Sequence, residues 1–308
     1  MRAWLLTVLL LAMGAVQASE WPRVIVHLQG DTELTAPPQR VVALDPTVTD
    51  HLLALGLPPI GSLTYGLARP DSRDAWPPAI AEQAVEASIA RVGTPGNLDL
   101  EAIAALEPDL VLASGYVGQS TYNTLTRIAP TVIIESERHF RSDLHQIAVA
   151  VGREQEAEAV LERYAKRVAA MRARLGGERV AIVRPRQQSV WMYGPSSNAG
   201  RLLTEAGINV KAVPDGASIT SDPPGAIGEL SLERVSAIDA PHLFVILYNL
   251  DHHAGLEGYL QGPMWQRLPA VQQGNVHGVE GIAWTNHGPI GALRMLEEAA
   301  AALEGGQP

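Results

Sequence analysis

Short apolar runs alternate with stretches of helical spacing in the first half of the chain. Residues 40–44 and 109–113 are continuous apolar runs of strand length, whereas residues 47–55 and 100–106 carry apolar side chains at helical spacing. Thr47 is placed to cap the first of these helices. Strands without polar alternation, separated by helices, indicate a parallel sheet that helices cover on both faces. The pattern therefore predicts an α/β fold.

A long amphipathic segment then interrupts this alternation. Residues 154–175 predict a single helix, because their apolar positions recur every three or four residues: Ala157, Val160, Leu161, Tyr164, Val168, Met171 and Leu175. The glycine pair Gly176-Gly177 ends it. A long helix between two alternating halves indicates a rigid connector between two lobes.

The second half repeats the alternation and contains an echo of the first. Residues 100–106 and 232–238 both read L-E-x-[I/V]-x-A-[L/I], and each segment precedes an apolar strand. Repeated helix–strand units on either side of a connector predict two related Rossmann-like lobes, with a ligand cleft between them. The other predicted strands and helices of this half are 179–183, 190–193, 199–206, 243–247 and 290–303.

The N-terminus resembles a secretory signal peptide. A charged opening precedes an apolar run at residues 5–13, and small residues follow at Val16-Gln17-Ala18. This run is too short to cross a hydrocarbon core of about 30 Å. The predicted division is a signal peptide at 1–18, an N-terminal lobe at 19–141, a connecting helix at 142–176 and a C-terminal lobe at 177–308.

Cysteine is absent from the sequence, so no thiol is present for a disulfide or a lipid anchor. We therefore expect a periplasmic protein that diffuses freely after cleavage near Ala18. The net charge of −10 and the pI near 5.4 argue against a nucleic-acid partner.

No catalytic motif is present in the sequence. The first strand is followed by Asp45-Pro46-Thr47 rather than by a glycine-rich dinucleotide loop, and the chain has no G-x-S-x-G, P-loop or H-E-x-x-H motif. We expect no enzyme activity and no cofactor. The adjacent pair His252-His253, with His277 and His287 further on, is interpreted as part of an ordinary polar loop rather than a zinc site, because neighbouring side chains diverge.

Three ordered segments carry a resemblance to a known family. Residues 92–95 (V-G-T-P) lead into 98–111 (LDLEAIAALEPDLV), residues 193–197 read Y-G-P-S-S, and residues 262–271 read GPMWQRLPAV. Together they resemble the iron-siderophore periplasmic binding proteins of the long-helix class, and most of all the ferric dicitrate and ferric hydroxamate binders. The resemblance implies two α/β lobes joined by one long helix with little hinge closure. It also implies delivery of a ferric chelate to the permease dimer of an ABC importer.

Two ligand-contacting residues follow from this resemblance. Tyr116, in Ser114-Gly115-Tyr116, matches a tyrosine that the hydroxamate binders use, and Trp284 matches a late tryptophan. One departure concerns Pro95, which stands where both relatives carry an arginine. In the hydroxamate binders that arginine contacts the ligand, so hydroxamate specificity does not transfer directly.

Further candidates follow from the chemistry of a bulky, anionic ferric chelate. Its iron is already wrapped by oxygen atoms, so the protein need not ligate metal directly. Aromatic rings and bidentate guanidinium groups are suited to hold it. Near the predicted strand ends, residues of these kinds, together with one aspartate, are Asp45, Tyr65, Arg184, Arg186, Trp191, Tyr193 and Tyr248.

Glu101 and Glu233 occupy equivalent positions in the echoed helices. The resemblance implies that one glutamate on each lobe docks to arginines of the permease, although the helix dipole alone also favours glutamate there. We expect a monomer that binds a ferric siderophore. The alternatives are haem or cobalamin binding on the same fold, with Tyr65 or Tyr116 as an axial ligand to haem, and a periplasmic enzyme.

Overall fold

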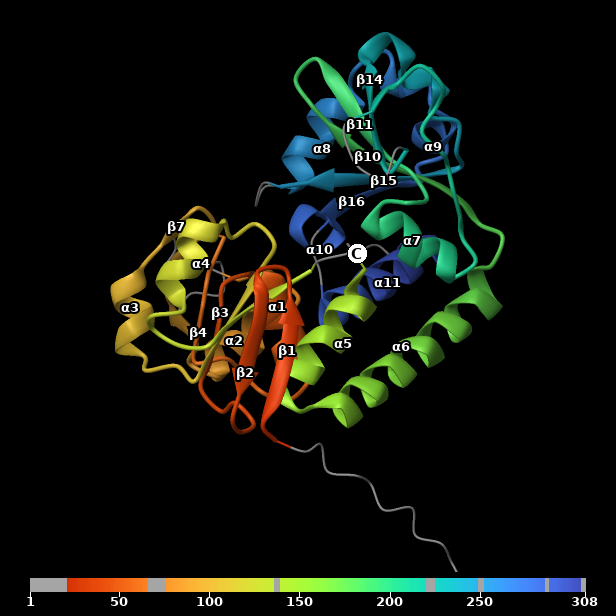
Figure 1. Ribbon diagram of the computed structural model, residues 1–308. Helices are drawn as coiled ribbons and strands as arrows, with labels where there is room; N and C mark the ends of the chain where they lie inside the picture. The colour runs from red at the N-terminus through yellow and green to blue at the C-terminus, as the bar shows by residue number, and fades with distance from the viewer. Residues whose placement is uncertain are drawn as a thin grey trace, which may run out of the picture.

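The computed structural model describes residues 21–65, 76–135, 139–219, 225–248, 252–285 and 288–305. Two α/β lobes make up this part of the chain, and they are joined by a long helix (Figure 1). This confirms the predicted fold class. The predicted signal peptide at 1–18 and His287 lie outside the described residues. No helix in the described ranges is both long and apolar enough to cross a membrane.

The first lobe is built on a five-stranded parallel sheet of order β5-β4-β3-β8-β9, as predicted for this half. Every residue of β8 and β9 is buried, which explains why these segments are apolar without alternation. The strands of this sheet are β3 (Val41–Ala43), β4 (Gly61–Ser62), β5 (Ala90–Arg91), β8 (Leu110–Ser114) and β9 (Thr131–Ile134).

Helices and two hairpins complete this lobe. The helices are α1 (Pro46–Ala54), α2 (Ala81–Glu86), α3 (Leu100–Ala105), α4 (Gln119–Leu125) and α5 (Phe140–Val151). The hairpins pair β1 (Arg23–His27) with β2 (Gly30–Leu34) and β6 (Gly93–Thr94) with β7 (Asn97–Leu98). One predicted cap is corrected: the N-cap of α1 is Asp45, whose Oδ1 accepts a hydrogen bond from the Thr47 amide at 2.7 Å.

The second lobe has a seven-stranded mixed sheet of order β13-β14-β11-β10-β15-β16, with β12 also paired to β10. Strand β10 runs parallel to β12 and β15 and antiparallel to β11. The strands are β10 (Arg179–Pro185), β11 (Ser189–Tyr193), β12 (Asn209–Val210), β13 (Ser218–Ile219), β14 (Ile227–Ser231), β15 (His242–Leu247) and β16 (Val276–Glu280).

The helices of the second lobe correct two predictions. The segment predicted as a helix at 232–238 is the 3-10 helix η2 (Leu232–Ala237), so the two echoed segments differ in helix type. His252-His253 open α8 (His252–Leu260) rather than a loop, because packing on β15 and β16 outweighs the two glycines in this segment. The remaining helices are α7 (Asn198–Glu205), η3 (Trp265–Arg267), α9 (Pro269–Gln272), α10 (Gly281–Thr285) and α11 (Pro289–Leu303).

Helix α6 (Glu154–Leu175) joins the lobes and confirms the predicted long helix. Its 22 residues span about 33 Å. The residues near its start, Ala157 and Val160, belong to the core of the first lobe, whereas Tyr164 and Met171 belong to that of the second. Within the predicted connector at 142–176, Gly152 in the left-handed conformation separates α5 from α6.

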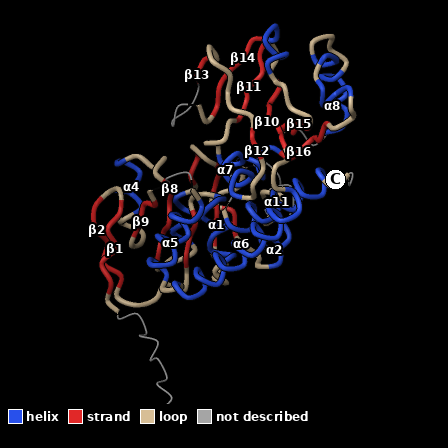
Figure 2. The backbone as a smooth tube through the Cα atoms, turned by 90° about the vertical axis from the view of Figure 1, so that its right-hand side faces the viewer, coloured by secondary structure: helices blue, strands red, loops and turns tan. Residues whose placement is uncertain are grey.

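Three helices lie where the lobes meet. Helix α11 packs against α1 and α5 of the first lobe and against α6, α7 and α10. Figure 2 shows α11 below β12 and β16 of the second lobe and next to α6. The C-terminal helix is therefore a second structural link between the lobes, besides α6.

Candidate functional site

A cavity of about 320 Å³ lies between the two lobes. The first lobe contributes the N-terminus of α1, the end of β8 and the start of α5, and the second contributes β10, β11, α7 and α10. Open α/β sheets bind ligands at the carboxyl ends of their strands, where loops present side chains to a crevice. Seven of the nine predicted ligand contacts line this cleft: Asp45, Tyr116, Arg184, Trp191, Tyr193, Tyr248 and Trp284.

Arginine and aromatic side chains alternate along the wall of the second lobe. The Arg184 guanidinium lies 4.0 Å from the centre of the Tyr248 ring and 5.5 Å from that of Trp191. The guanidinium group of Arg186 lies 4.7 Å from the centre of the same Trp191 ring. Cation–π contacts hold a guanidinium in place without using its hydrogen-bond donors. The row therefore presents oriented donors to the cleft.

Arg201 is a cleft residue that the sequence analysis missed. It lies on α7, and its Nε donates to the Ser196 carbonyl oxygen at 3.0 Å. The available indication in the sequence was its position four residues after the Y-G-P-S-S segment. Within the ranges that the structure describes, no carboxylate lies within 4.0 Å of Arg184 or Arg201. Two guanidinium groups at the cleft thus remain available to an anion.

The wall of the first lobe is more exposed. Tyr116 follows β8 and is 90% exposed, which is unusual for an aromatic side chain. Asp45 also borders the cleft, but its carboxylate is already used as the N-cap of α1. Tyr116 therefore remains the strongest candidate for a ligand contact from this lobe.

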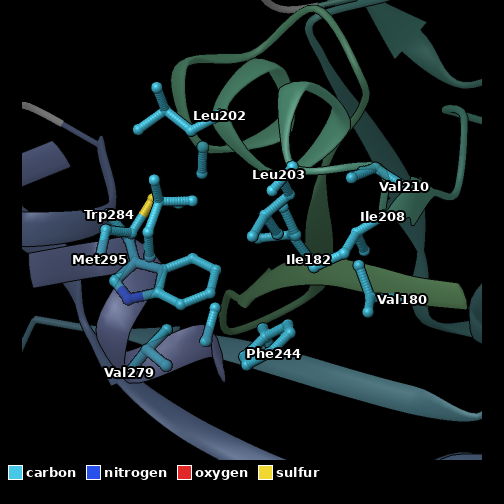
Figure 3. Close-up of a cluster of buried hydrophobic side chains, with 14 of the residues drawn as sticks. Val180, Ile182, Leu202, Leu203, Ile208, Val210, Phe244, Val279, Trp284 and Met295 are labelled. Atoms are coloured by element: carbon cyan, nitrogen blue, oxygen red, sulfur yellow. The ribbon is translucent and has the colours of Figure 1, made fainter. Parts of the chain in front are cut away.

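Trp284 borders the cleft from below rather than from its surface. Its side chain is fully buried among apolar residues such as Phe244, Val279 and Met295 (Figure 3), and its Nε1 donates to Glu298 at 3.2 Å. The ring therefore supports the floor of the cleft, and a direct contact between Trp284 and a ligand stays a prediction. The position of Trp284 in the sequence correctly predicted that it lies next to the cleft. The burial of its side chain depends on how α10 packs against α11 and β15.

Tyr193 is also largely a core residue, with 5% of its surface exposed. Burial, together with Tyr248, raises the pKa of its hydroxyl, and the nearby Arg184 and Arg186 guanidinium groups act in the opposite direction. The hydroxyl therefore stays protonated at neutral pH. Its edge contributes to the cleft as a hydrogen-bonding group next to Arg184.

Two predicted contacts lie away from this cleft. Tyr65 follows β4 and does not border it. Arg186 borders an adjoining, more open hollow of the second lobe, which also contains Gln187 and Gln188. Arg184 and Tyr248 border both spaces and separate them.

The two glutamates predicted to dock to a permease are on the surface. Glu101 lies in the first turn of α3 and Glu233 in the first turn of η2, and both are exposed. Within the described residues, neither forms an ion pair. Their role in docking stays a prediction.

The chain is similar to known proteins over most of its length. A family described as periplasmic binding protein matches residues 41–281, which include both walls of the cleft. Among curated proteins, the chain is similar to the Fe(3+) dicitrate-binding periplasmic protein FecB of Escherichia coli (strain K12). The two are 30% identical over 272 residues, which cover 87% of this chain and 85% of that protein.

A second relative is named for a different chelate. The ferric enterobactin-binding periplasmic protein FepB of Escherichia coli O6:H1 is 31% identical over 291 residues, with 89% of each chain covered. Among solved structures, SirA of Staphylococcus aureus complexed with staphyloferrin B has a TM-score of 0.73 at 24% identity. The similarity covers 92% of this chain and 98% of SirA. This structural likeness supports the two-lobed fold, and the differing ligand names leave the choice of ligand to the chemistry of the cleft.

Proposed function

Because the chain belongs to the periplasmic binding protein family, we propose that it captures a ferric siderophore complex between its lobes and delivers it to an ABC importer. The observation that carries this proposal is the pair of cleft arginines, Arg184 and Arg201, that no carboxylate neutralises within the described residues. Both guanidinium groups are partly exposed to the cleft, so an anionic ligand can pair with them directly.

The ligand we propose is a carboxylate-rich chelate of the citrate or α-hydroxycarboxylate type. A guanidinium group binds a carboxylate through two parallel hydrogen bonds, and such charge-assisted pairs are both stronger and more directional than neutral ones. Cation–π contacts with Tyr248 and Trp191 already restrain Arg184, so little side-chain entropy is lost when the ligand binds. Tyr116 faces this row from the other lobe and supplies an aromatic surface.

Iron enters this scheme as cargo. Within the described residues, no group of three or more His, Cys, Asp or Glu side chains is arranged to hold a metal ion. The chelate keeps its own oxygen ligands around the iron, and the protein recognises the outer surface of the complex. In this proposal, capture depends on the charge and shape of the chelate.

Delivery uses the outer surfaces of the two lobes. Glu101 and Glu233 each lie beside an exposed leucine, Leu100 and Leu232, both 37% exposed. One such glutamate on each lobe would allow two arginine-bearing permease subunits to be contacted together. We propose that the mature protein acts as a monomer in the periplasm.

Tryptophan fluorescence of the mature protein tests the ligand class. Ferric citrate is titrated against a ferric hydroxamate, a ferric catecholate, haemin and cobalamin, with Trp191 as the reporter at the cleft wall. We expect saturable quenching by ferric citrate. Loss of a charge-assisted hydrogen bond costs about 1.5–3 kcal/mol, so Arg184→Ala or Arg201→Ala should weaken binding by about tenfold to a hundredfold.

A matched control is Arg163→Ala on the exposed face of α6, which should leave the affinity unchanged. Binding of the hydroxamate or catecholate alone would refute the carboxylate class but keep the transport role. Binding of haemin or cobalamin alone would refute siderophore capture. Turnover of a chelate without stable binding would favour an enzyme.

A further inference from the structure

Asp50 is a carboxylate in the middle of α1 and is only 4% exposed. Its Oδ1 accepts a hydrogen bond from the Ile290 amide at 2.8 Å, and its Oδ2 accepts from the amides of Gly291 at 2.9 Å and Gly288 at 3.2 Å. These amides form the N-terminus of α11, where backbone donors lack partners within the helix. No local side chain caps α11. Asp50, about 240 residues earlier in the chain, is its cap.

The surroundings of Asp50 are those of an ionised carboxylate. All three backbone partners are donors, and the positive end of the α11 dipole faces the two oxygens. Burial raises the pKa of the Asp50 carboxyl above its usual range, and His51 and the three amides act in the opposite direction. A neutral carboxyl would bring an O–H donor into a site that otherwise contains only donors.

His51, the next residue, has the complementary environment. Its ring is 1% exposed, with Nδ1 2.7 Å from the Thr47 carbonyl oxygen and Nε2 3.1 Å from that of Phe140. Carbonyl oxygens only accept hydrogen bonds, whereas a neutral imidazole has a single N–H. Both contacts are hydrogen bonds only if the ring is doubly protonated.

Other charged groups near the pair come from α5. Asp143 is 7% exposed and His139 caps the helix, and both border the cleft with His51. The first turn of α11 carries no acidic side chain. The negative end of the pair is therefore directed to α11, and its positive end to the start of α5.

We propose that Asp50 and His51 form a buried ionic clasp that holds α1 against α5 and α11 and thereby positions the two walls of the cleft. Helix α11 packs into the core of the second lobe through Met295 and Leu296, and α10 immediately precedes it. Thr285, at the end of α10, is hydrogen-bonded to the Tyr248 hydroxyl at 2.7 Å. The clasp thus connects the first lobe to the arginine-bearing wall, whichever chelate the cleft binds.

A glycine permits the close approach that the clasp requires. A Cβ atom on Gly288 would lie 2.7 Å from the carboxylate carbon of Asp50. Any side chain here would push the helix terminus and the carboxylate apart. Gly288→Ala therefore disrupts the clasp while leaving both charges in place.

Nuclear magnetic resonance of the wild-type protein tests the charge state. Long-range correlations between ring protons and nitrogens distinguish an imidazolium from either neutral tautomer. We expect His51 to show two protonated nitrogens at neutral pH, because both ring nitrogens face carbonyl oxygens. A neutral tautomer at His51 under these conditions would overturn the proposal without any variant.

Spin labels test the positioning role. Because the chain has no cysteine, Ser120→Cys in the first lobe and Gln187→Cys in the second accept exactly one label pair, and both sites are exposed. Electron–electron distance measurements should give one narrow distribution in the otherwise wild-type protein. Asp50→Asn and Gly288→Ala should broaden it or shift it to longer distances.

The matched control is Asp109→Asn. This carboxylate also accepts two backbone hydrogen bonds, from Gln39 at 2.7 Å and Arg40 at 2.9 Å, but entirely within the first lobe. It should leave the label distance unchanged. An unaltered distribution in both folded clasp variants would show that the lobes are positioned without Asp50. This readout needs no ligand, so it is independent of the proposed chelate.

Discussion

Two carboxylates, Asp50 and Glu205, link the lobes in different ways. Asp50 is buried and accepts only backbone amides. Glu205, on α7, has a side chain that is 26% exposed and accepts from side chains alone. Its partners are the Tyr164 hydroxyl at 2.7 Å, Arg141 Nη2 at 2.8 Å and His139 Nε2 at 3.3 Å.

The difference concerns how far each link can adapt. Backbone amides at a helix terminus are fixed, so the position of α11 depends directly on Asp50. The side chains around Glu205 can change rotamer, and solvent can replace a lost partner. We therefore expect Asp50 to define the geometry between the lobes and Glu205 to contribute mainly stability.

The largest expected effect is that of removing the buried carboxylate. Asp50→Ala leaves the three amides at the start of α11 without their partner and removes the buried negative charge beside His51, and such a loss costs about 3–5 kcal/mol. Glu205→Ala should cost about 1–3 kcal/mol because water can reach the vacated site. Urea unfolding midpoints of the two variants measure this difference. Equal losses of unfolding free energy in the two variants would show that the buried and the partly exposed carboxylate stabilise the protein to the same extent.

Sequence reasoning predicted well the features that depend on local pattern. The apolar spacing over 154–175 reproduces α6 residue for residue, and the apolar runs place β3, β8, β10 and β15 to within a few residues. The alternation also predicted the parallel sheet of the first lobe. These features follow from helical periodicity and from strands that are buried on both faces, and both leave a pattern in consecutive residues.

Features that depend on distant contacts were not predictable in this way. Trp284 lies in the right place but points into the core, and Arg201 reaches the cleft only because α7 is oriented by its packing. The partner amides of Asp50 begin 238 residues later in the chain. No local pattern marks that aspartate, which in sequence is an ordinary polar residue on an amphipathic helix.

Tyr164→Phe sharpens the comparison by removing one partner of Glu205. Burial and the adjacent Glu205 carboxylate raise the pKa of the Tyr164 hydroxyl far above its usual range, so it is always the donor. We expect a loss of about 1.5–2 kcal/mol, at the lower end for a hydrogen bond to a charged group, because the Glu205 carboxylate is partly exposed. A double-mutant cycle with Glu205→Gln should give a coupling of at least about 0.5 kcal/mol. Strict additivity would show that the two side chains act independently.

The pH dependence of stability gives a further test of Glu205. Although burial opposes the change, the His139 and Tyr164 hydrogen bonds and the Arg141 charge lower the pKa of this carboxyl below its ordinary value of 4.5. A lowered pKa in the folded state means that the ionised group stabilises the fold above about pH 4.5. This contribution is lost as the pH falls through the folded-state value.

Glu205→Gln cannot lose a proton, so the stability difference between the wild type and this variant should shrink below pH 4.5. Thermal unfolding from pH 7 to pH 3.5 measures it. Asp109→Asn, which alters an exposed carboxylate within one lobe, serves as the reference for general acid effects. A constant difference between the wild type and Glu205→Gln would show that Glu205 keeps the same protonation equilibrium in the folded and unfolded chain.

The smallest effect is expected for an exposed ion pair between α6 and α11, the two helices that join the lobes. Arg167 on α6 lies 3.2 Å from Glu297 on α11, and their side chains are 43% and 58% exposed. Water and salt screen such a pair, and holding two long side chains together costs entropy. Arg167→Ala should change the unfolding free energy by less than about 0.5 kcal/mol and leave the spin-label distance unchanged. A loss of unfolding free energy close to that of Glu205→Ala would mean that the exposure of a contact does not determine how much it stabilises the protein.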